Sequence, residues 1–393
     1  MSGRGAPQWL WTRRTLLRRV TMGVAGAISA GPVATLLENW TQPPPRFVYV
    51  GADACIAVYA TAGGKWLLRQ TVPCEKAASL AIHPSGQFLY AAHAVERFQN
   101  LPRGAVGAYA IHPASGRLTL LDRQPLSLSA TSPRSLAIAP DGRHLVVAAY
   151  GGGAYNLLPI AGDGALQRVS GILKQTGAGA DPQTQSCSHP HTAIFDSSGQ
   201  FLIGSDFGSD RLNVLAVRDG ELLGCNRRDT APGSGPSSLV LHPAGDRLYA
   251  MNLIAGSIAC HPYDPTSGRI GAPLQVISTG RVSEGCGFAS SALQFHPRGR
   301  ALYAVDGSYP SEQAIASWRV DPLSGFLSPL ERWRCAARSI SSLSLTPGAA
   351  SLLLTDRMAN RVLRLHLDPV TGAMGRAELL AELASPLSIA CQG

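Results

Sequence analysis

Short apolar segments alternate with turn residues along almost all of the chain after residue 45. An apolar run, a turn and a second apolar run recur together, most clearly at residues 80–90, 136–146 and 239–249. In these copies a Pro starts the turn and a Gly follows two residues later, which favours a tight hairpin. Aliphatic and β-branched runs of this length, bounded by turn residues, are typical of strands. The pattern therefore predicts a succession of antiparallel hairpins.

The hairpins recur at a nearly constant spacing. The turn positions 84, 140, 197, 243, 297 and 347 lie 56, 57, 46, 54 and 50 residues apart. A period near 50 residues indicates a propeller or a solenoid. A second sequence motif marks an outer hairpin in several repeats, and its glycine stands at positions 116, 268, 325 and 372. Two hairpins give four strands in each repeat, which is the content of a propeller blade.

The two ends of the repeat region complete each other. Residues 385–390 resemble the innermost strand of a repeat, whereas residues 47–50 and 55–59 resemble the next two strands of a repeat that lacks it. Joined, they make a seventh blade and leave no open sheet edge between first and last blade. We therefore predict an all-β fold over residues 47–393, a seven-bladed β-propeller with four-stranded blades, closed by pairing of the N- and C-terminal strands.

The first 38 residues read as a targeting segment. Arg13 and Arg14 are followed by two Leu residues, Arg18 and a soft apolar run at 20–37. Twin arginines before such a run are typical of the twin-arginine export signal. We therefore expect a signal at residues 1–38, a Pro-rich linker at 39–46 and a periplasmic or secreted protein. No clean cleavage site is present, so retention as an inner-membrane anchor stays open.

Charge and cysteine usage narrow the choice of partners. The formal net charge of the 393 residues is +9, and it falls to +5 when the Arg-rich first 40 residues are set aside. No run of Lys and Arg interleaved with aromatics is present, so we expect no nucleic-acid partner. The eight Cys include no Cys-x-x-Cys pair, and disulfides and buried thiols both stay open. We expect no metal and no cofactor, and a small-molecule ligand in the central funnel.

Three further segments carry a family resemblance. They read Tyr150-Gly-Gly-Gly153, His189-Pro-His191 and Ser205-Asp206-Phe-Gly-Ser-Asp210-Arg211. From Phe47 onward the chain resembles the lactonase family of seven-bladed propellers, which includes bacterial 6-phosphogluconolactonases and fungal carboxymuconate-cyclising enzymes. The resemblance implies ring opening of a lactone at the central mouth. It also implies substrate contacts at the aligned positions, which are Tyr150, Gln185, Asn252 and Asp306.

Lactone hydrolysis needs a donor or cation for the oxyanion and a base for the nucleophile. His191, with His189 beside it, is the candidate base, and Asp206 is a candidate to orient a histidine. His189 and His191 are two positions apart and would share one face of a regular strand. His-Pro also recurs in hairpin turns, however, which shows that histidine here often has an architectural role.

The chain departs from the family where charge is expected. Family Arg, Glu and Arg positions are occupied here by Ser237, Leu253 and Gly307. A phosphate group would call for Arg or Lys at such positions, so a phosphorylated lactone is disfavoured. Two hypotheses therefore stand at this point. One is an exported lactonase-like hydrolase that acts on a small lactone, and the other is a catalytically silent propeller that serves as a periplasmic binding or scaffold protein.

Overall fold

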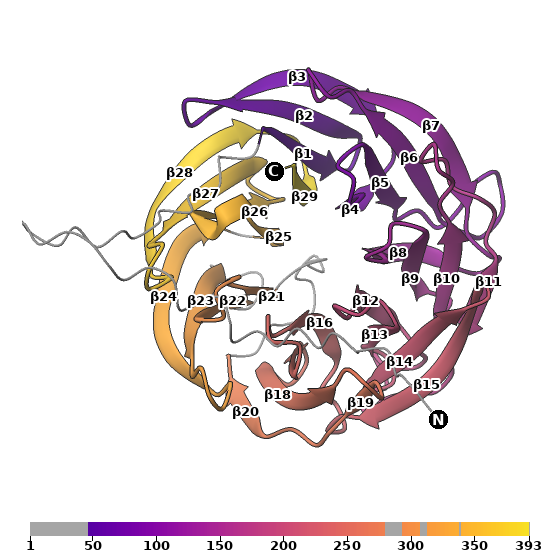
Figure 1. The fold of residues 1–393 in the computed structure, drawn as a ribbon, viewed down its shortest axis with the longest axis vertical. Helices are drawn as coiled ribbons and strands as arrows, with labels where there is room; N and C mark the ends of the chain where they lie inside the picture. The colour runs from indigo at the N-terminus through magenta and orange to yellow at the C-terminus, as the bar shows by residue number, and fades with distance from the viewer. Residues whose placement is uncertain (1–45, 280–292, 307–312, 338, 393) are drawn as a thin grey trace, which may run out of the picture. The chain divides into compact units, whose positions relative to one another are not determined.

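The computed structural model describes residues 46–279, 293–306, 313–337 and 339–392. They form seven antiparallel sheets around a common centre (Figure 1). The described part of the chain contains no α-helix and one 3₁₀ turn, Pro347–Ala349. The prediction of a seven-bladed propeller is confirmed. The expected signal and nearly all of the linker lie outside the described residues, and no helix among the described residues is long and apolar enough to span a membrane.

Within each blade the strands run from the centre outward in chain order, apart from the blade shared by the two ends. The first three blades are blade 1 with β29 (Pro386–Gln392), β1 (Phe47–Ala52), β2 (Cys55–Ala62) and β3 (Lys65–Pro73); blade 2 with β4 (Ala77–Ile82), β5 (Phe88–His93), β6 (Ala105–Ile111) and β7 (Leu118–Pro125); and blade 3 with β8 (Thr131–Ile138), β9 (His144–Gly151), β10 (Ala154–Pro159) and β11 (Gly171–Lys174).

The remaining blades are blade 4 with β12 (Pro190–Phe195), β13 (Phe201–Asp206), β14 (Arg211–Arg218) and β15 (Glu221–Asp229); blade 5 with β16 (Pro236–Leu241), β17 (Arg247–Asn252), β18 (Ser257–Asp264), β19 (Arg269–Ile270) and β20 (Gln275–Ser278); blade 6 with β21 (Leu293–Phe295), β22 (Ala301–Asp306), β23 (Gln313–Val320) and β24 (Leu327–Ala337); and blade 7 with β25 (Ile340–Leu345), β26 (Ser351–Asp356), β27 (Arg361–Leu367) and β28 (Met374–Glu382). Blade 5 departs from four strands because β19 and β20 share the outer edge of β18.

The two terminal strands close the ring. β29 pairs antiparallel with β1, with Val48 opposite Cys391 and Ala52 opposite Pro386. Figure 1 shows the yellow β29 beside the indigo β1. The predicted closure is therefore confirmed, and β1 has a partner on both of its edges.

The repeated glycine of the inner hairpins is explained by its backbone conformation. Six glycines, one in each of blades 2 to 7, have φ between 70° and 77°: Gly86, Gly142, Gly199, Gly245, Gly299 and Gly348. This left-handed region costs a residue with a Cβ about 1–2 kcal/mol. The turn geometry therefore accounts for the most regular feature of the sequence.

The apolar core is distributed between adjacent blades. One cluster joins blades 2 and 3 through Tyr90 and Leu145, and another joins blades 7 and 1 through Leu353 and Val48. Each apolar blade face is thus removed from water by the next blade, which is the main source of stability in a stacked array.

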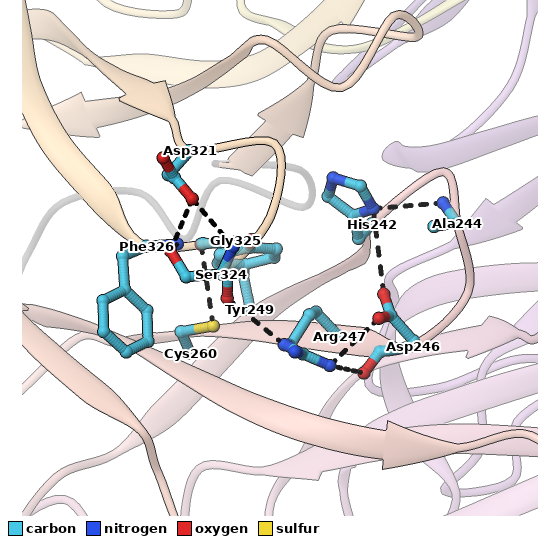
Figure 2. A network of polar contacts seen from close by, with 10 residues as sticks. All are labelled: His242, Ala244, Asp246, Arg247, Tyr249, Cys260, Asp321, Ser324, Gly325 and Phe326. Atoms are coloured by element: carbon cyan, nitrogen blue, oxygen red, sulfur yellow. Dashed lines mark hydrogen bonds and ion pairs between the residues drawn. The ribbon is translucent and has the colours of Figure 1, made fainter.

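A buried tyrosine ties several blades to the next one. Its hydroxyl donates to the carbonyl oxygen of the outer-hairpin glycine in the following blade, at distances from 2.6 to 3.1 Å: Tyr49 to Gly116, Tyr90 to Gly164, Tyr249 to Gly325 and Tyr303 to Gly372. Figure 2 shows this tyrosine clasp between blades 5 and 6, where Arg247 also donates to the Ser324 carbonyl at 3.4 Å. Val146, Ile203 and Leu353 stand at the corresponding place in blades 3, 4 and 7 and have no hydroxyl to donate.

The innermost strands share an irregularity at their first residues. The pairing register shifts between Pro133 and Ser135 in blade 3 and between Pro190 and Thr192 in blade 4, with similar shifts in blades 2 and 7. Such a bulge leaves one residue outside the ladder and re-aims its side chain. In blades 3 and 4 the bulged residues are Arg134 and His191, which places two polar side chains from neighbouring blades at the same end of the ring.

Candidate active site

The two histidines meet at a single aromatic ring. His189 lies just before β12, and its ring stacks on Tyr150 of β9 with a centroid distance of 4.3 Å and an interplanar angle of 8°. His191 meets the same ring edge-on at 6.2 Å and 79°. Because β12 is bulged between Pro190 and Thr192, the rule for a regular strand does not apply here. Tyr150, rather than strand alternation, brings the two imidazoles together.

Arg134 of blade 3 joins this group. Its guanidinium carbon lies over the Tyr150 ring, 5.0 Å from the centroid, and its side chain is partly buried. Burial lowers the pKa of Arg134 and the Arg357 charge adds to this, whereas Tyr150 and Glu96 act in the opposite direction. The ordinary pKa of an arginine side chain lies so far above 7 that Arg134 stays cationic.

The sequence reasoning missed Arg134, although a signal was present. Pro133-Arg134-Ser135 aligns with Pro190-His191-Thr192 when the innermost strands are compared by repeat.

His191 is poorly suited to accept a proton. Its side chain is buried, with 1% of its surface exposed. Burial lowers its pKa to about 3, and the nearby Arg134 charge contributes in the same direction. His191 is therefore neutral at ordinary pH. A base with so low a pKa removes protons inefficiently from water or a hydroxyl group.

His189 has the orientation expected of a base. Its Nδ1 lies 2.9 Å from the carbonyl oxygen of Tyr150. A carbonyl only accepts, so Nδ1 carries the hydrogen and donates, which leaves Nε2 as the acceptor nitrogen of the neutral ring. The His189 side chain is partly exposed, and Nε2 lies 3.6 Å from the exposed thiol of Cys187. Of the two predicted histidines, His189 is thus the better placed for proton transfer.

Asp206 holds the backbone in front of β12. Its buried carboxylate accepts from the Ser188 hydroxyl at 2.6 Å, from the His189 backbone N–H at 2.8 Å and from the Gly208 N–H at 3.1 Å. These contacts are to the main chain and to a hydroxyl, and none is to an imidazole nitrogen. Asp206 therefore positions His189 through its backbone.

The other three predicted substrate contacts are engaged with nearby protein groups. The Gln185 amide donates to the Phe207 carbonyl and to Asp210, both at 2.7 Å. The Asn252 amide donates to Ser257 at 3.2 Å. Asp306 forms an ion pair with Arg332 at 3.0 Å. All three side chains are buried, and of the four predicted contact residues the structure brings Tyr150 together with the histidines.

Comparison with known proteins places this architecture in a family. The family model described as lactonase, 7-bladed beta-propeller matches residues 58–391. The chain belongs to the lactonase family.

Individual relatives agree with this assignment. This lactonase-family chain is 26% identical over 272 residues to 6-phosphogluconolactonase of Bacillus subtilis, which spans 69% of this chain and 76% of the relative. It is 22% identical over 334 residues to 6-phosphogluconolactonase of Formosa agariphila, spanning 83% and 92% of the two chains. A periplasmic gluconolactonase of Pseudomonas aeruginosa has the same fold, with a TM-score of 0.78, 22% identity, and coverage of 88% of this chain and 99% of that one.

In this lactonase propeller the axial channel differs from the mouth in character. The channel has a volume of about 340 Å³ and is lined by the innermost strands. Hydroxyl side chains recur there at one register: Ser79, Ser135, Thr192, Ser238, Ser342 and Ser388. Two of them accept hydrogen bonds across a blade junction, Ser79 from the Leu136 N–H and Ser135 from the Ala193 N–H, both at 3.3 Å. Over the described residues no group of three or more His, Cys, Asp and Glu side chains is arranged to hold a metal ion.

Proposed function

We propose that this lactonase-family propeller hydrolyses a small lactone at the mouth formed by blades 3 and 4. The observation that carries the proposal is the grouping of Arg134, His189 and His191 around the Tyr150 ring. A cation and an imidazole with an acceptor nitrogen are the groups that lactone opening needs, and both pack on the Tyr150 ring. The relatives named 6-phosphogluconolactonase support the same reaction class.

In the proposed reaction His189 transfers the proton and Arg134 stabilises the developing charge. The lactone binds beside the Arg134 and His189 side chains that pack on Tyr150, and Nε2 of His189 takes the proton of the attacking nucleophile. The carbonyl oxygen gains negative charge as the nucleophile adds, and Arg134 stabilises that charge. The proton held by His189 then passes to the ring oxygen as the ring opens. His191 stays neutral throughout because burial keeps its pKa near 3.

We place a lactone without a phosphate group in this site. Recognition of a phosphate dianion usually draws on Arg or Lys in direct contact. Arg357, whose charge is felt by Arg134, is engaged by Asp53 at 2.9 Å. The mouth therefore offers a phosphate less positive charge than the number of arginines suggests.

The test is turnover of D-glucono-1,5-lactone by the purified protein, followed by acid release at constant pH. We expect measurable hydrolysis, and we expect Arg134→Gln to lower kcat by about a hundredfold, the usual cost of removing an oxyanion donor. Arg218→Gln is the matched control because Arg218 is exposed at the end of β14. Failure of the wild-type protein across a panel of lactones, or full activity of Arg134→Gln, contradicts the proposal.

One observation favours a second function, a propeller that binds a ligand without transforming it. The channel is lined by hydroxyl and aliphatic side chains and by Gln294, which supply hydrogen bonds but neither a base nor a cation. If ligand binding is the function, we expect saturable binding of a neutral polyol or sugar that is left chemically unchanged. Robust lactone turnover that depends on Arg134 excludes it as the main function.

We further propose that the protein works outside the cytoplasm. Support comes from the twin arginines at positions 13 and 14 and from the periplasmic gluconolactonase that shares the fold. Replacing both arginines by Lys is expected to retain the protein in the cytoplasmic fraction. Unchanged export of that variant contradicts the twin-arginine route but leaves the proposed reaction intact.

A further inference from the structure

A thiol lies against the proposed base. Sγ of the exposed Cys187 is 3.6 Å from Nε2 of His189, a hydrogen-bonding distance for sulfur. Because Nδ1 of His189 is committed as a donor to the Tyr150 carbonyl, Nε2 is the nitrogen that accepts. The S–H group of Cys187 therefore points its proton at the acceptor side of the imidazole.

The arrangement has the three parts of an activated nucleophile. These are a nucleophilic side chain, a base within reach of its proton, and a third group that orients the base. Here they are Cys187, His189 and the carbonyl of Tyr150, with the Tyr150 ring stacked on the imidazole at 4.3 Å. The orienting groups come from blade 3, whereas Cys187 and His189 belong to the segment that leads into blade 4.

The backbone around this pair is tightly specified. A Cβ at Gly208 would lie 1.9 Å from the Cys187 carbonyl oxygen and 2.8 Å from Cδ2 of His189. No side chain fits there without displacing the pair, so glycine is required by the close approach. Asp206 holds the His189 N–H at 2.8 Å from the same turn. The backbone that carries the thiol and the imidazole is thus held in one conformation.

Other cysteines provide an internal contrast. Cys225 is also exposed, but its Sγ contacts the backbone carbonyl of Leu223 at 3.7 Å. Cys260 is buried and its Sγ lies 3.9 Å from the Gly325 carbonyl. Among the cysteines whose side chains the structure describes, Cys187 is the one whose thiol has a hydrogen bond to a histidine.

We infer that Cys187 is the nucleophile of the reaction and forms a thioester with the opened lactone, an inference that rests on the proposed function. Cys187 gives its proton to Nε2 of His189 as the sulfur bonds to the lactone carbonyl carbon. The bond from that carbon to the ring oxygen breaks, and the ring oxygen takes the proton from His189. Water then gives a proton to His189 and adds as hydroxide to the thioester carbonyl. The carbon–sulfur bond breaks, the sulfur recovers the proton, and a hydroxy acid is released.

The first experiment measures thiol reactivity without relying on lactonase activity. The reduced full-length protein is treated with limiting iodoacetamide at pH 7, and the alkylation of each cysteine peptide is timed by mass spectrometry. Cys187 is expected to react at least about tenfold faster than Cys225, because the nearby base takes its proton. The difference is expected to disappear in His189→Gln. Equal rates for the two cysteines in the wild-type protein overturn the inference.

The second experiment asks whether the thiol takes part in turnover. With D-glucono-1,5-lactone, Cys187→Ala and Cys187→Ser are expected to lose more than about a hundredfold in kcat, whereas Cys225→Ala keeps wild-type activity. With 4-nitrophenyl acetate, acid quenching is expected to trap one acetyl group on the Cys187 peptide.

The outcomes separate the inference from the proposed function. Full lactonase activity in Cys187→Ala, with loss in His189→Gln, means that His189 activates water directly, so the inference fails and the proposed function stands. If the wild-type protein opens no lactone but acetylates selectively at Cys187, the proposed function fails and the reactive thiol stands. Absence of the acetyl adduct together with unselective alkylation rejects the thiol nucleophile.

Discussion

Blades 4 and 7 carry the same framework but not the same chemistry. In both, the last residue of the second strand is a buried aspartate, Asp206 or Asp356, which accepts the backbone N–H of the residue before the innermost strand. Four positions later the backbone of each blade turns at a residue in the left-handed conformation, Asp210 with φ of 52° in blade 4 and Asn360 with φ of 55° in blade 7. These shared features recur in blade 7, which has no histidine in its innermost strand or at the residue before it, so they belong to blade construction.

The differences lie at three positions around that framework. Where blade 4 has Cys187, His189 and His191, the same register in blade 7 holds Ala337, Ser339 and Ser341. At these three positions the fold therefore does not require the thiol and the two imidazoles of blade 4. The comparison teaches that a motif repeated around the ring is a poor guide to catalysis, and that departures from the repeat are a better one.

The largest expected effect comes from making blade 4 resemble blade 7 at the base. His189→Ser is expected to lower lactone turnover by about 10²–10⁴, the usual contribution of a general base. His189 is partly exposed, so the free energy of unfolding is expected to change little. Steady-state kinetics and urea unfolding check the two expectations. His112→Ser, at an exposed histidine in an outer hairpin, serves as the control.

Removing the shared aspartate is expected to affect both blades. Asp206→Ala and Asp356→Ala each leave buried donors without a charged acceptor, at a cost of about 3 kcal/mol in the free energy of unfolding. Urea titration measures this cost. Activity per folded molecule is expected to fall in Asp206→Ala alone, because Asp206 holds the His189 backbone. An equal loss of activity in Asp356→Ala would remove the distinction between framework and site.

His191 of blade 4, which has no counterpart in blade 7, is expected to make the free energy of unfolding depend on pH. The pKa of His191 is about 3 in the folded protein against an ordinary 6.5. Above pH 6.5 both states are neutral there. Between pH 6.5 and 3 the unfolded chain binds a proton that the folded chain does not, so stability falls as the pH falls, by about 1.4 kcal/mol per pH unit.

His191→Gln removes this contribution, so its unfolding free energy is expected to depend less steeply on pH than that of the wild type. Ser341→Ala, at the corresponding position in blade 7, is expected to keep the wild-type slope. Urea titrations at several pH values between 4 and 7 provide the measurement. Parallel slopes for the wild type and His191→Gln would show that His191 titrates normally.

The smallest effect concerns the tyrosine clasp. Tyr303 donates to Gly372 and ties blade 6 to blade 7, whereas Val146 and Ile203 leave both junctions of blade 4 without this bond. Tyr303→Phe is expected to cost about 1 kcal/mol in unfolding free energy and to leave turnover unchanged. Ile203→Leu controls for a change of side chain at the corresponding position. A loss of lactonase activity in Tyr303→Phe would show that blade 7 influences the site.

The fold could be predicted because its determinants are local and repeated. Each inner hairpin of blades 2 to 7 is marked in the sequence by a turn glycine, because few other residues adopt its left-handed backbone conformation. The spacing of these six glycines gives the length of the repeat. Closure of the ring was predictable because residues 385–390 resemble an innermost strand, whereas residues 47–59 resemble a blade that lacks one. The outer edge of blade 5, split between β19 and β20, could not be foreseen because no repeated turn marks it.

The site was predictable only in part. His189, His191 and Tyr150 stood out as a motif, and the structure brings their rings together. Arg134 was missed because it lies outside the family motifs, on the innermost strand of blade 3, where only the alignment of the repeats marks it. The orientation of His189 and the neutrality of His191 depend on a carbonyl and on burial, and neither is written in the spacing of the residues.

The pairing of β29 with β1 sets an order for folding during synthesis. β1 precedes every other described strand in the chain, yet its inner partner β29 follows the six other blades. Until then the edge of β1 offers free backbone groups to any other extended chain. A chain that ends within blade 7 would therefore keep one edge of β1 unpaired, and such an edge favours aggregation.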